Sequence, residues 1–113
     1  MNSVGHFELP ARDMKKLAAF YEQLFGWKPE PMGSDYTMVN PPEGIAGGLK
    51  PDTRATLIYI EVEDIAAKLR EIEVAGGVVV TPEAKVESSD GENRGKIGFF
   101  KDPNGTLIGM WSR

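Results

Sequence analysis

The segment "TLIYIEVEDIAAKLREIEVAGG", residues 56–77, decides the fold because its pattern occurs twice in the chain. Ile58, Ile60 and Val62 alternate with other side chains, which is typical of a half-buried strand. Asp64 is then a candidate N-cap for a helix, because apolar residues recur after it at helical spacing. The segment therefore predicts a strand followed by a helix.

An earlier segment, "VGHFELPARDMKKLAAFYEQLFG" at residues 4–26, has the same order of features. An alternating stretch precedes Asp13, a second candidate N-cap, and Gly26 provides a left-handed end to the predicted helix. An offset of 51 residues takes Asp13 to Asp64 and Gly26 to Gly77. The two segments are therefore predicted to be copies of one unit.

Short strand-like segments follow each predicted helix and are separated by turns rich in proline and glycine. In chain order they are YTMVN (36–40), GIAGGL (44–49), VVVTP (78–82), KIGFF (96–100) and TLIGMW (106–111). Each half therefore has the order βαβββ, with module one at about 1–50 and module two at about 55–113. We expect one α+β domain over residues 1–113, in which two curled mixed sheets surround a cleft.

Strand alternation predicts which side chains face this cleft and which lie beneath the helices. The residues expected to face the cleft are His6, Glu8, Tyr59, Glu61 and Trp111. The residues expected beneath the helices are Phe7, Leu9, Ile58, Ile60 and Met110.

The composition limits the functions that the chain could have. Its 113 residues, 41% hydrophobic and 27% charged, suit one folded domain. The net charge of −4 and the absence of a basic stripe argue against nucleic acid as a partner. No apolar run is long enough for a membrane span and no signal peptide is recognisable, so we expect a cytoplasmic protein. The sequence has no cysteine, which excludes disulfides and thiolate chemistry.

Three segments carry a resemblance to a known family: residues 5–27 (GHFELPARDMKKLAAFYEQLFGW), 59–77 (YIEVEDIAAKLREIEVAGG) and 99–111 (FFKDPNGTLIGMW). They resemble the vicinal oxygen chelate superfamily, which includes glyoxalase I, fosfomycin and bleomycin resistance proteins, and extradiol dioxygenases. The nearest similarity is to small glyoxalase-like proteins. The resemblance implies a homodimer that binds a small molecule.

The resemblance also implies a divalent metal held by four positions, which correspond here to His6, Gly48, Leu57 and Gly109. Offsets within the internal repeat relate the same positions: 51 residues take His6 to Leu57, and 61 take Gly48 to Gly109. Only the histidine has a side-chain donor, whereas a catalytic divalent ion needs about three protein ligands. We therefore expect no cofactor at the usual positions.

Two interpretations of the predicted site remain open. His6, Glu8 and Glu61 could form a substitute site for a divalent metal. Alternatively the cleft holds no metal, with His6 and Glu8 as catalytic groups or simply as ligand contacts. If Glu8 and Glu61 met across the cleft, the repulsion between the two carboxylates would raise their pKa values.

The predicted ligand-binding residues are His6, Tyr59, Glu61 and Trp111, whose aromatic rings suit a planar organic molecule. Tyr36 or Met38 could extend this wall, and the polar residues 92–96 could cover it or form a solvated loop. The expected function is a glyoxalase-like lyase or isomerase without the usual metal, or a dioxygenase. The alternative is a non-catalytic protein that sequesters a drug, of the bleomycin-resistance type.

Overall fold

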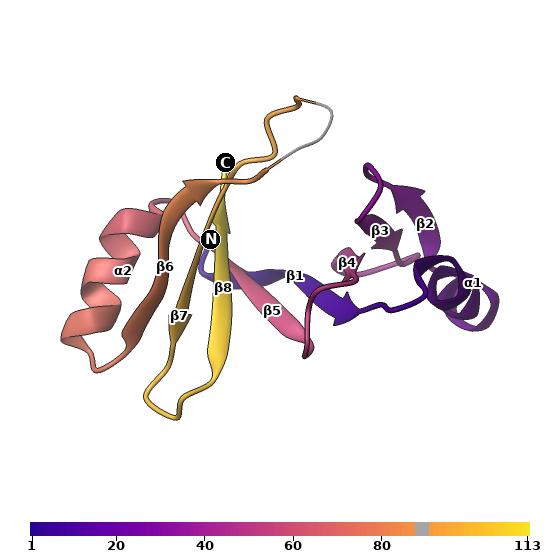
Figure 1. Ribbon diagram of the computed structural model, residues 1–113. Coiled ribbons are helices and arrows are strands. Elements are labelled where there is room, and N and C mark those ends of the chain that lie inside the picture. The colour runs from indigo at the N-terminus through magenta and orange to yellow at the C-terminus, as the bar shows by residue number, and fades with distance from the viewer. Residues whose placement is uncertain (88–90) are drawn as a thin grey trace. The chain divides into compact units, whose positions relative to one another are not determined.

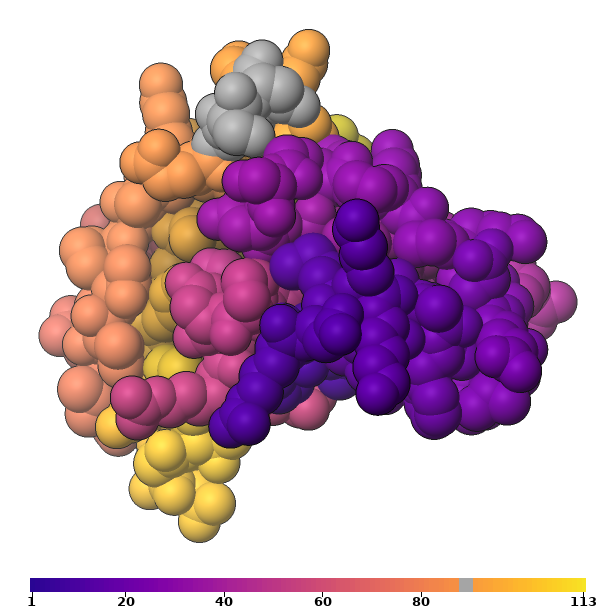
Figure 2. Space-filling view, turned by 45° about the vertical axis from the view of Figure 1, so that its right-hand side comes forward, coloured from indigo at the N-terminus to yellow at the C-terminus, as the bar shows by residue number. Residues whose placement is uncertain are grey.

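The chain divides into two units in the computed structural model, which describes residues 1–87 and 91–113. The N-terminal unit comprises Gly5–Leu57, and the C-terminal unit comprises Ile58–Arg113 together with Met1–Val4. In the space-filling view the surface of the N-terminal unit runs from indigo to magenta, and that of Ile58–Arg113 from pink to yellow (Figure 2).

The N-terminal unit contains β1 (Ser3–Pro10), α1 (Met14–Phe25), β2 (Lys28–Pro31), β3 (Thr37–Asn40) and β4 (Gly47–Lys50). Its strands lie in the order β2-β3-β4-β1, with β1 parallel to β4 and the other neighbours antiparallel. Helix α1 packs against β2, β3 and β4 (Figure 1). This is the βαβββ order that the sequence predicts.

Local signals fix both ends of α1. The Asp13 side chain accepts a hydrogen bond from the backbone N–H of Lys16, and Gly26 has a left-handed φ of 72°. The helix packs on a core in which Leu49 is fully buried. The core residues are Ala11, Ala18, Val39 and Leu49, with Phe7, Leu9, Met14, Leu17 and Trp27 packed against them.

The C-terminal unit repeats this order with β5 (Leu57–Glu61), α2 (Ile65–Val74), β6 (Val78–Lys85), β7 (Lys96–Lys101) and β8 (Leu107–Ser112). Its strands lie in the order β5-β8-β7-β6, with β5 parallel to β8, and α2 packs on β6, β7 and β8 (Figure 1). The core consists of Val62, Ile65, Leu69, Phe100 and Met110, with Ile60, Ile72, Val79 and Ile108 packed against it.

Two details differ from the sequence-based predictions. No strand was predicted at Lys28–Pro31, where β2 pairs with β3, because two prolines weaken a strand signal and such strands belong at sheet edges. Ile58 was expected beneath the helix but is 38% exposed, and it precedes the part of β5 that pairs with β8.

The end of the second helix also differs from the repeat. The offset places its glycine end at Gly77, but the left-handed residue is Gly76, with φ of 100°. Helix α2 ends at Val74, two residues before the offset predicts, and Ala75 with φ of −86° separates it from Gly76. Neither of these helices, within the described parts of the chain, has the length and apolar character that a membrane span requires.

Candidate functional site

A hydrogen-bonded cluster of three side chains lies in the N-terminal unit. The hydroxyl of Tyr36 lies 2.8 Å from Nε2 of His6 and donates to Oε2 of Glu8 at 3.0 Å. Strand β1 supplies the histidine and the glutamate on one face, because they are two residues apart. Their neighbours Phe7 and Leu9 pack on the α1 side, as the alternation predicts.

The local backbone positions Tyr36 immediately before β3. Its carbonyl accepts a hydrogen bond from the backbone N–H of Met32, which closes the loop between β2 and β3. The ring of Tyr36 is stacked on that of His6, with ring centroids 6.5 Å apart. Glu8 is only 7% exposed, so its hydrogen bond to the hydroxyl is made away from bulk water.

The direction of these hydrogen bonds assigns the histidine tautomer. Tyr36 has one hydroxyl hydrogen and donates it to Glu8, so its oxygen accepts a hydrogen bond from His6. A neutral imidazole then carries its hydrogen on Nε2, and Nδ1 is the basic nitrogen.

Burial lowers the pKa of His6 below its ordinary value of 6.5, because the charged imidazolium loses contact with water. The negative charge of Glu8 opposes this effect and raises the pKa. The net direction is downward, which favours a neutral imidazole at neutral pH.

Gly48 explains why the Tyr36 ring can lie where it does. A Cβ atom at position 48 would lie 1.8 Å from the Tyr36 hydroxyl oxygen and 2.1 Å from the ring carbon that carries it. Strand β4 is paired so that Gly48 is the register partner of Glu8 on β1 and of Met38 on β3. The glycine therefore provides the space that the tyrosine fills.

From the sequence, Tyr36 was expected only to extend an aromatic wall, and its hydrogen bonds were not predicted. A glycine on one strand and an aromatic residue near it on the adjacent strand form a known packing pair. Tyr36 and Gly48 form such a pair. The sequence does not show it, because the pairing of β3 with β4 that brings the two residues together is known only from the tertiary structure.

Tyr59 forms a similar contact in the C-terminal unit. It is the register partner of Gly109, and a Cβ atom on that glycine would lie 2.5 Å from the tyrosine ring. The ring also meets Phe99 edge-on, with centroids 5.7 Å apart, and Tyr59 is only 6% exposed. Glu61, two residues further along β5, is partly exposed and accepts a backbone hydrogen bond from Asn2.

Trp111 is anchored by the polar segment that precedes β7. Its indole N–H donates to the carbonyl oxygen of Arg94 at 2.8 Å, and Gly95 lies directly against the ring. The guanidinium of Arg113 lies 5.9 Å from the ring centroid. Because Trp111 is the register partner of Glu61, these two predicted site residues are neighbours in the C-terminal unit.

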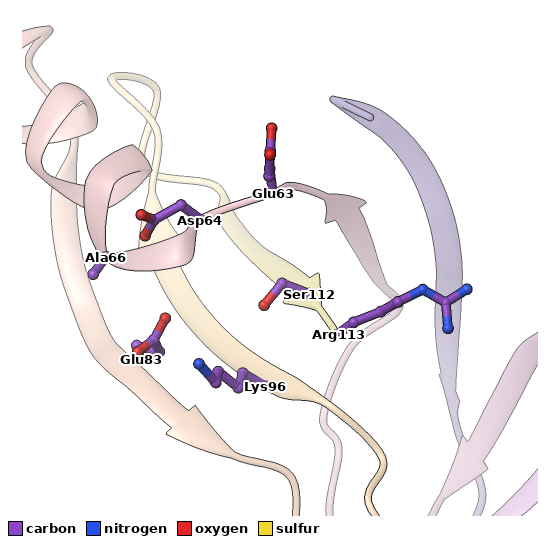
Figure 3. Close-up of a pocket in the computed structure, with 7 residues that line it drawn as sticks. All are labelled: Glu63, Asp64, Ala66, Glu83, Lys96, Ser112 and Arg113. Atoms are coloured by element: carbon purple, nitrogen blue, oxygen red, sulfur yellow. The ribbon is translucent and has the colours of Figure 1, made fainter.

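A pocket of about 530 Å³ lies elsewhere in the C-terminal unit, beside the start of α2 (Figure 3). Its lining residues are Glu63, Asp64, Ala66, Glu83, Lys96, Ser112 and Arg113. The lining is charged and includes none of the residues predicted to bind a ligand. The side chain of Asp64 is already used to cap α2, where it accepts a hydrogen bond from Ala67.

The repeated βαβββ order of the two units defines a class of protein that comparison with known families identifies. The profile of the Glyoxalase/Bleomycin resistance protein/Dioxygenase superfamily matches residues 3–110. The chain therefore belongs to this superfamily, also called the vicinal oxygen chelate superfamily, as its sequence motifs indicate. No curated protein matches the chain.

Solved structures share the fold at low sequence identity. Methylmalonyl-CoA epimerase from Mycobacterium tuberculosis is 16% identical with a TM-score of 0.73, and the match covers 97% of this chain and 87% of that chain. A hypothetical protein from Bacillus halodurans is 16% identical with a TM-score of 0.74, covering 98% and 94%. A structure described as NAD-dependent benzaldehyde dehydrogenase from Legionella pneumophila is 13% identical with a TM-score of 0.72, covering 95% and 96%. These similarities show the fold alone.

The residues of this chain do not fit the divalent metal that the family implies. Gly48, Leu57 and Gly109 offer no side-chain donor, and tyrosine rings fill the space above the two glycines. Residues 1–87 and 91–113 contain no group of three histidine, aspartate or glutamate side chains that could hold a metal ion. The substitute site considered from the sequence, with His6, Glu8 and Glu61, combines residues of both units and stays a prediction.

Proposed function

We propose that this protein binds a small organic molecule at the cluster of His6, Tyr36 and Glu8, and that it acts there as a glyoxalase-like lyase or isomerase. The observation that carries the proposal is the Tyr36 hydroxyl, which is hydrogen-bonded to both other side chains. Such a chain fixes the tautomer and the orientation of an imidazole, as a catalytic base requires.

Each member of the cluster has a separate part in this proposal. His6 accepts a proton at Nδ1, since its Nε2 hydrogen is directed at the tyrosine oxygen. Glu8 holds the hydroxyl of Tyr36 in the orientation that accepts from the histidine, and it stabilises the imidazolium formed by proton transfer. Removing a proton from one carbon and returning it to another is the basic step of many isomerases.

The C-terminal unit, described by itself, carries the other ligand contacts that the sequence predicted. Trp111 provides aromatic surface for a planar ligand, and its register partner Glu61 provides a carboxylate acceptor. Tyr59 is only 6% exposed and supports the strand that carries Glu61. The protein is proposed to work as a homodimer in the cytoplasm, as the family resemblance implies.

Binding is tested by screening small organic fragments with NMR against protein that has been treated with a chelator. The single histidine of the chain gives an unambiguous imidazole signal, so a fragment at the cluster is expected to shift it. Tyr36→Phe is expected to weaken binding of such a fragment by about tenfold, because His6 loses the hydrogen bond that orients its imidazole. Lys16→Ala, on the exposed surface of α1, is the matched control and is expected to change nothing. If His6→Ala and Tyr36→Phe leave the affinities of all bound fragments unchanged, the proposed site is wrong.

Catalysis is tested separately by following a bound fragment in D2O. A lyase or isomerase that removes a proton from carbon is expected to exchange that position for deuterium, and His6→Ala is expected to stop the exchange. Tight binding with no exchange would contradict the enzymatic role and favour the sequestering alternative.

A further inference from the structure

A tyrosine ring packs over a glycine in both units, at the two glycines that correspond to metal-ligating positions. The ring of Tyr36 fills the side-chain space of Gly48, and the ring of Tyr59 fills that of Gly109. In both cases the nearest ring or hydroxyl atom is within 2.5 Å of where a Cβ atom would be. Any larger residue at either glycine would therefore require the tyrosine to move.

Strand register shows what a side chain at position 48 would do if the tyrosine were absent. Gly48 is paired with Glu8 on the adjacent parallel strand, so a side chain there would share a face with Glu8 and with His6. Imidazole and carboxylate groups are ligands that divalent transition metals accept. A third donor at position 48 would bring the number of such side chains on this face to three.

The Tyr36 hydroxyl takes this place and changes the chemistry of the two remaining donors. It accepts a hydrogen bond from Nε2 of His6, which therefore carries a hydrogen where a metal would need a lone pair. It also donates to Oε2 of Glu8. A metal ion at the place of the hydroxyl would have to displace both hydrogen bonds before it could use Nε2 of His6 and Oε2 of Glu8.

We propose that Tyr36 and Gly48 are a coupled replacement for a metal ligand: the tyrosine hydroxyl occupies the space of the third ligating side chain and keeps this face free of divalent metal. Tyr36 is a positioning residue in this proposal. The proposal concerns metal exclusion, so it does not depend on the identity of the ligand proposed above.

The test is calorimetric titration of the purified full chain with Zn2+ and Ni2+. The natural protein is expected to bind neither ion at one equivalent, whereas Tyr36→Ala/Gly48→Glu opens the space and supplies a third ligand. The double variant is expected to bind about a hundredfold more tightly than its matched control, Tyr36→Ala/Gly48→Gln, which has the same size without the carboxylate. Adding His6→Ala to the double variant is expected to abolish the gain.

Two results of this titration would overturn the proposal. The first is binding of one equivalent of metal by the natural protein that disappears in His6→Ala. The second is a folded Tyr36→Ala/Gly48→Glu variant that binds metal no more tightly than the glutamine control. Circular dichroism establishes folding in each case.

A single conservative variant tests the proposal if the double variants do not fold. Tyr36→Phe keeps the ring but removes the hydroxyl, so the Nε2 hydrogen of His6 loses its acceptor. Nitrogen NMR of the one imidazole is expected to show that the Nε2–H tautomer predominates in the natural protein and loses its predominance in Tyr36→Phe. An unchanged tautomer ratio would overturn the assigned role of the hydroxyl. The expected change in the ratio reports the hydroxyl and not the packing, because Tyr36→Phe keeps the ring.

Discussion

Replacing Gly48 by alanine tests the packing of Tyr36 with the smallest possible change. The backbone of Gly48 does not have the positive φ that disfavours other residues, so alanine is conformationally acceptable there. The new methyl group would lie 1.8 Å from the tyrosine oxygen, 2.1 Å from Cζ and 2.6 Å from Cε2. The ring must therefore move by roughly 1.5 Å to reach ordinary van der Waals contact.

The expected cost follows from the contacts that this movement disturbs. Displacing the hydroxyl lengthens both the 2.8 Å contact with His6 and the 3.0 Å contact with Glu8 beyond hydrogen-bonding distance. Two hydrogen bonds, one of them to a carboxylate, contribute about 2–4 kcal/mol, and overpacking adds about 1–3 kcal/mol. We expect Gly48→Ala to lower the free energy of unfolding by roughly 3–7 kcal/mol, or the melting temperature by at least about 10 °C.

A double-mutant cycle measured by urea and thermal unfolding separates this contact from general strand effects. In a Tyr36→Ala background the methyl group meets no ring, so Gly48→Ala should be neutral or stabilising by up to about 1 kcal/mol. Gly47→Ala is the matched control, because a Cβ atom there would lie 2.2 Å from Phe7 instead. Its cost should be the same whether or not Tyr36 is present.

The reasoning would be refuted if Gly48→Ala cost as much in the Tyr36→Ala background as in the natural protein. That result would mean that position 48 rejects a side chain for a reason other than the tyrosine. A Gly47→Ala cost that also fell in the Tyr36→Ala background would show that the cycle reports general loosening of the sheet.

Four further predictions follow from the same structure. The pKa of His6 should lie below 6.5 by NMR titration, because burial lowers it. The folded state then binds fewer protons than the unfolded state. The free energy of unfolding should therefore fall as the pH drops below 6.5 through the folded pKa. Glu8→Gln should lower that pKa further, since the charge of Glu8 raises it, and a pKa that rose would contradict the assignment. Ile65→Ala should reduce the free energy of unfolding by about 2–5 kcal/mol in denaturant titrations, because this side chain is fully buried in the C-terminal core, and a cost below 1 kcal/mol would be inconsistent with it. Asp64→Ala should cost about 1 kcal/mol in the same assay by removing the cap on Ala67, whereas Asp64→Asn should cost much less.

The periodic features of the chain could be read from its sequence, because they depend on neighbours in the chain. Alternation along β1 placed Phe7 and Leu9 in the core, and Asp13 and Asp64 were correctly predicted as helix caps. Such signals are local and repeat with a fixed period, so they do not require knowledge of the tertiary structure. The short edge strand β2 was missed because its two prolines carry the signal of a turn.

The contents of the candidate site depended on contacts between distant segments. The sequence identified His6 and Glu8 as neighbours on one face and showed that Gly48 and Gly109 could not bind a metal. It could not show that Tyr36, 28 residues from Glu8 and 30 from His6, places its hydroxyl between them. That position is set by the pairing of β3 with β4 and of β4 with β1, since only this register brings the tyrosine ring over a glycine with space to receive it.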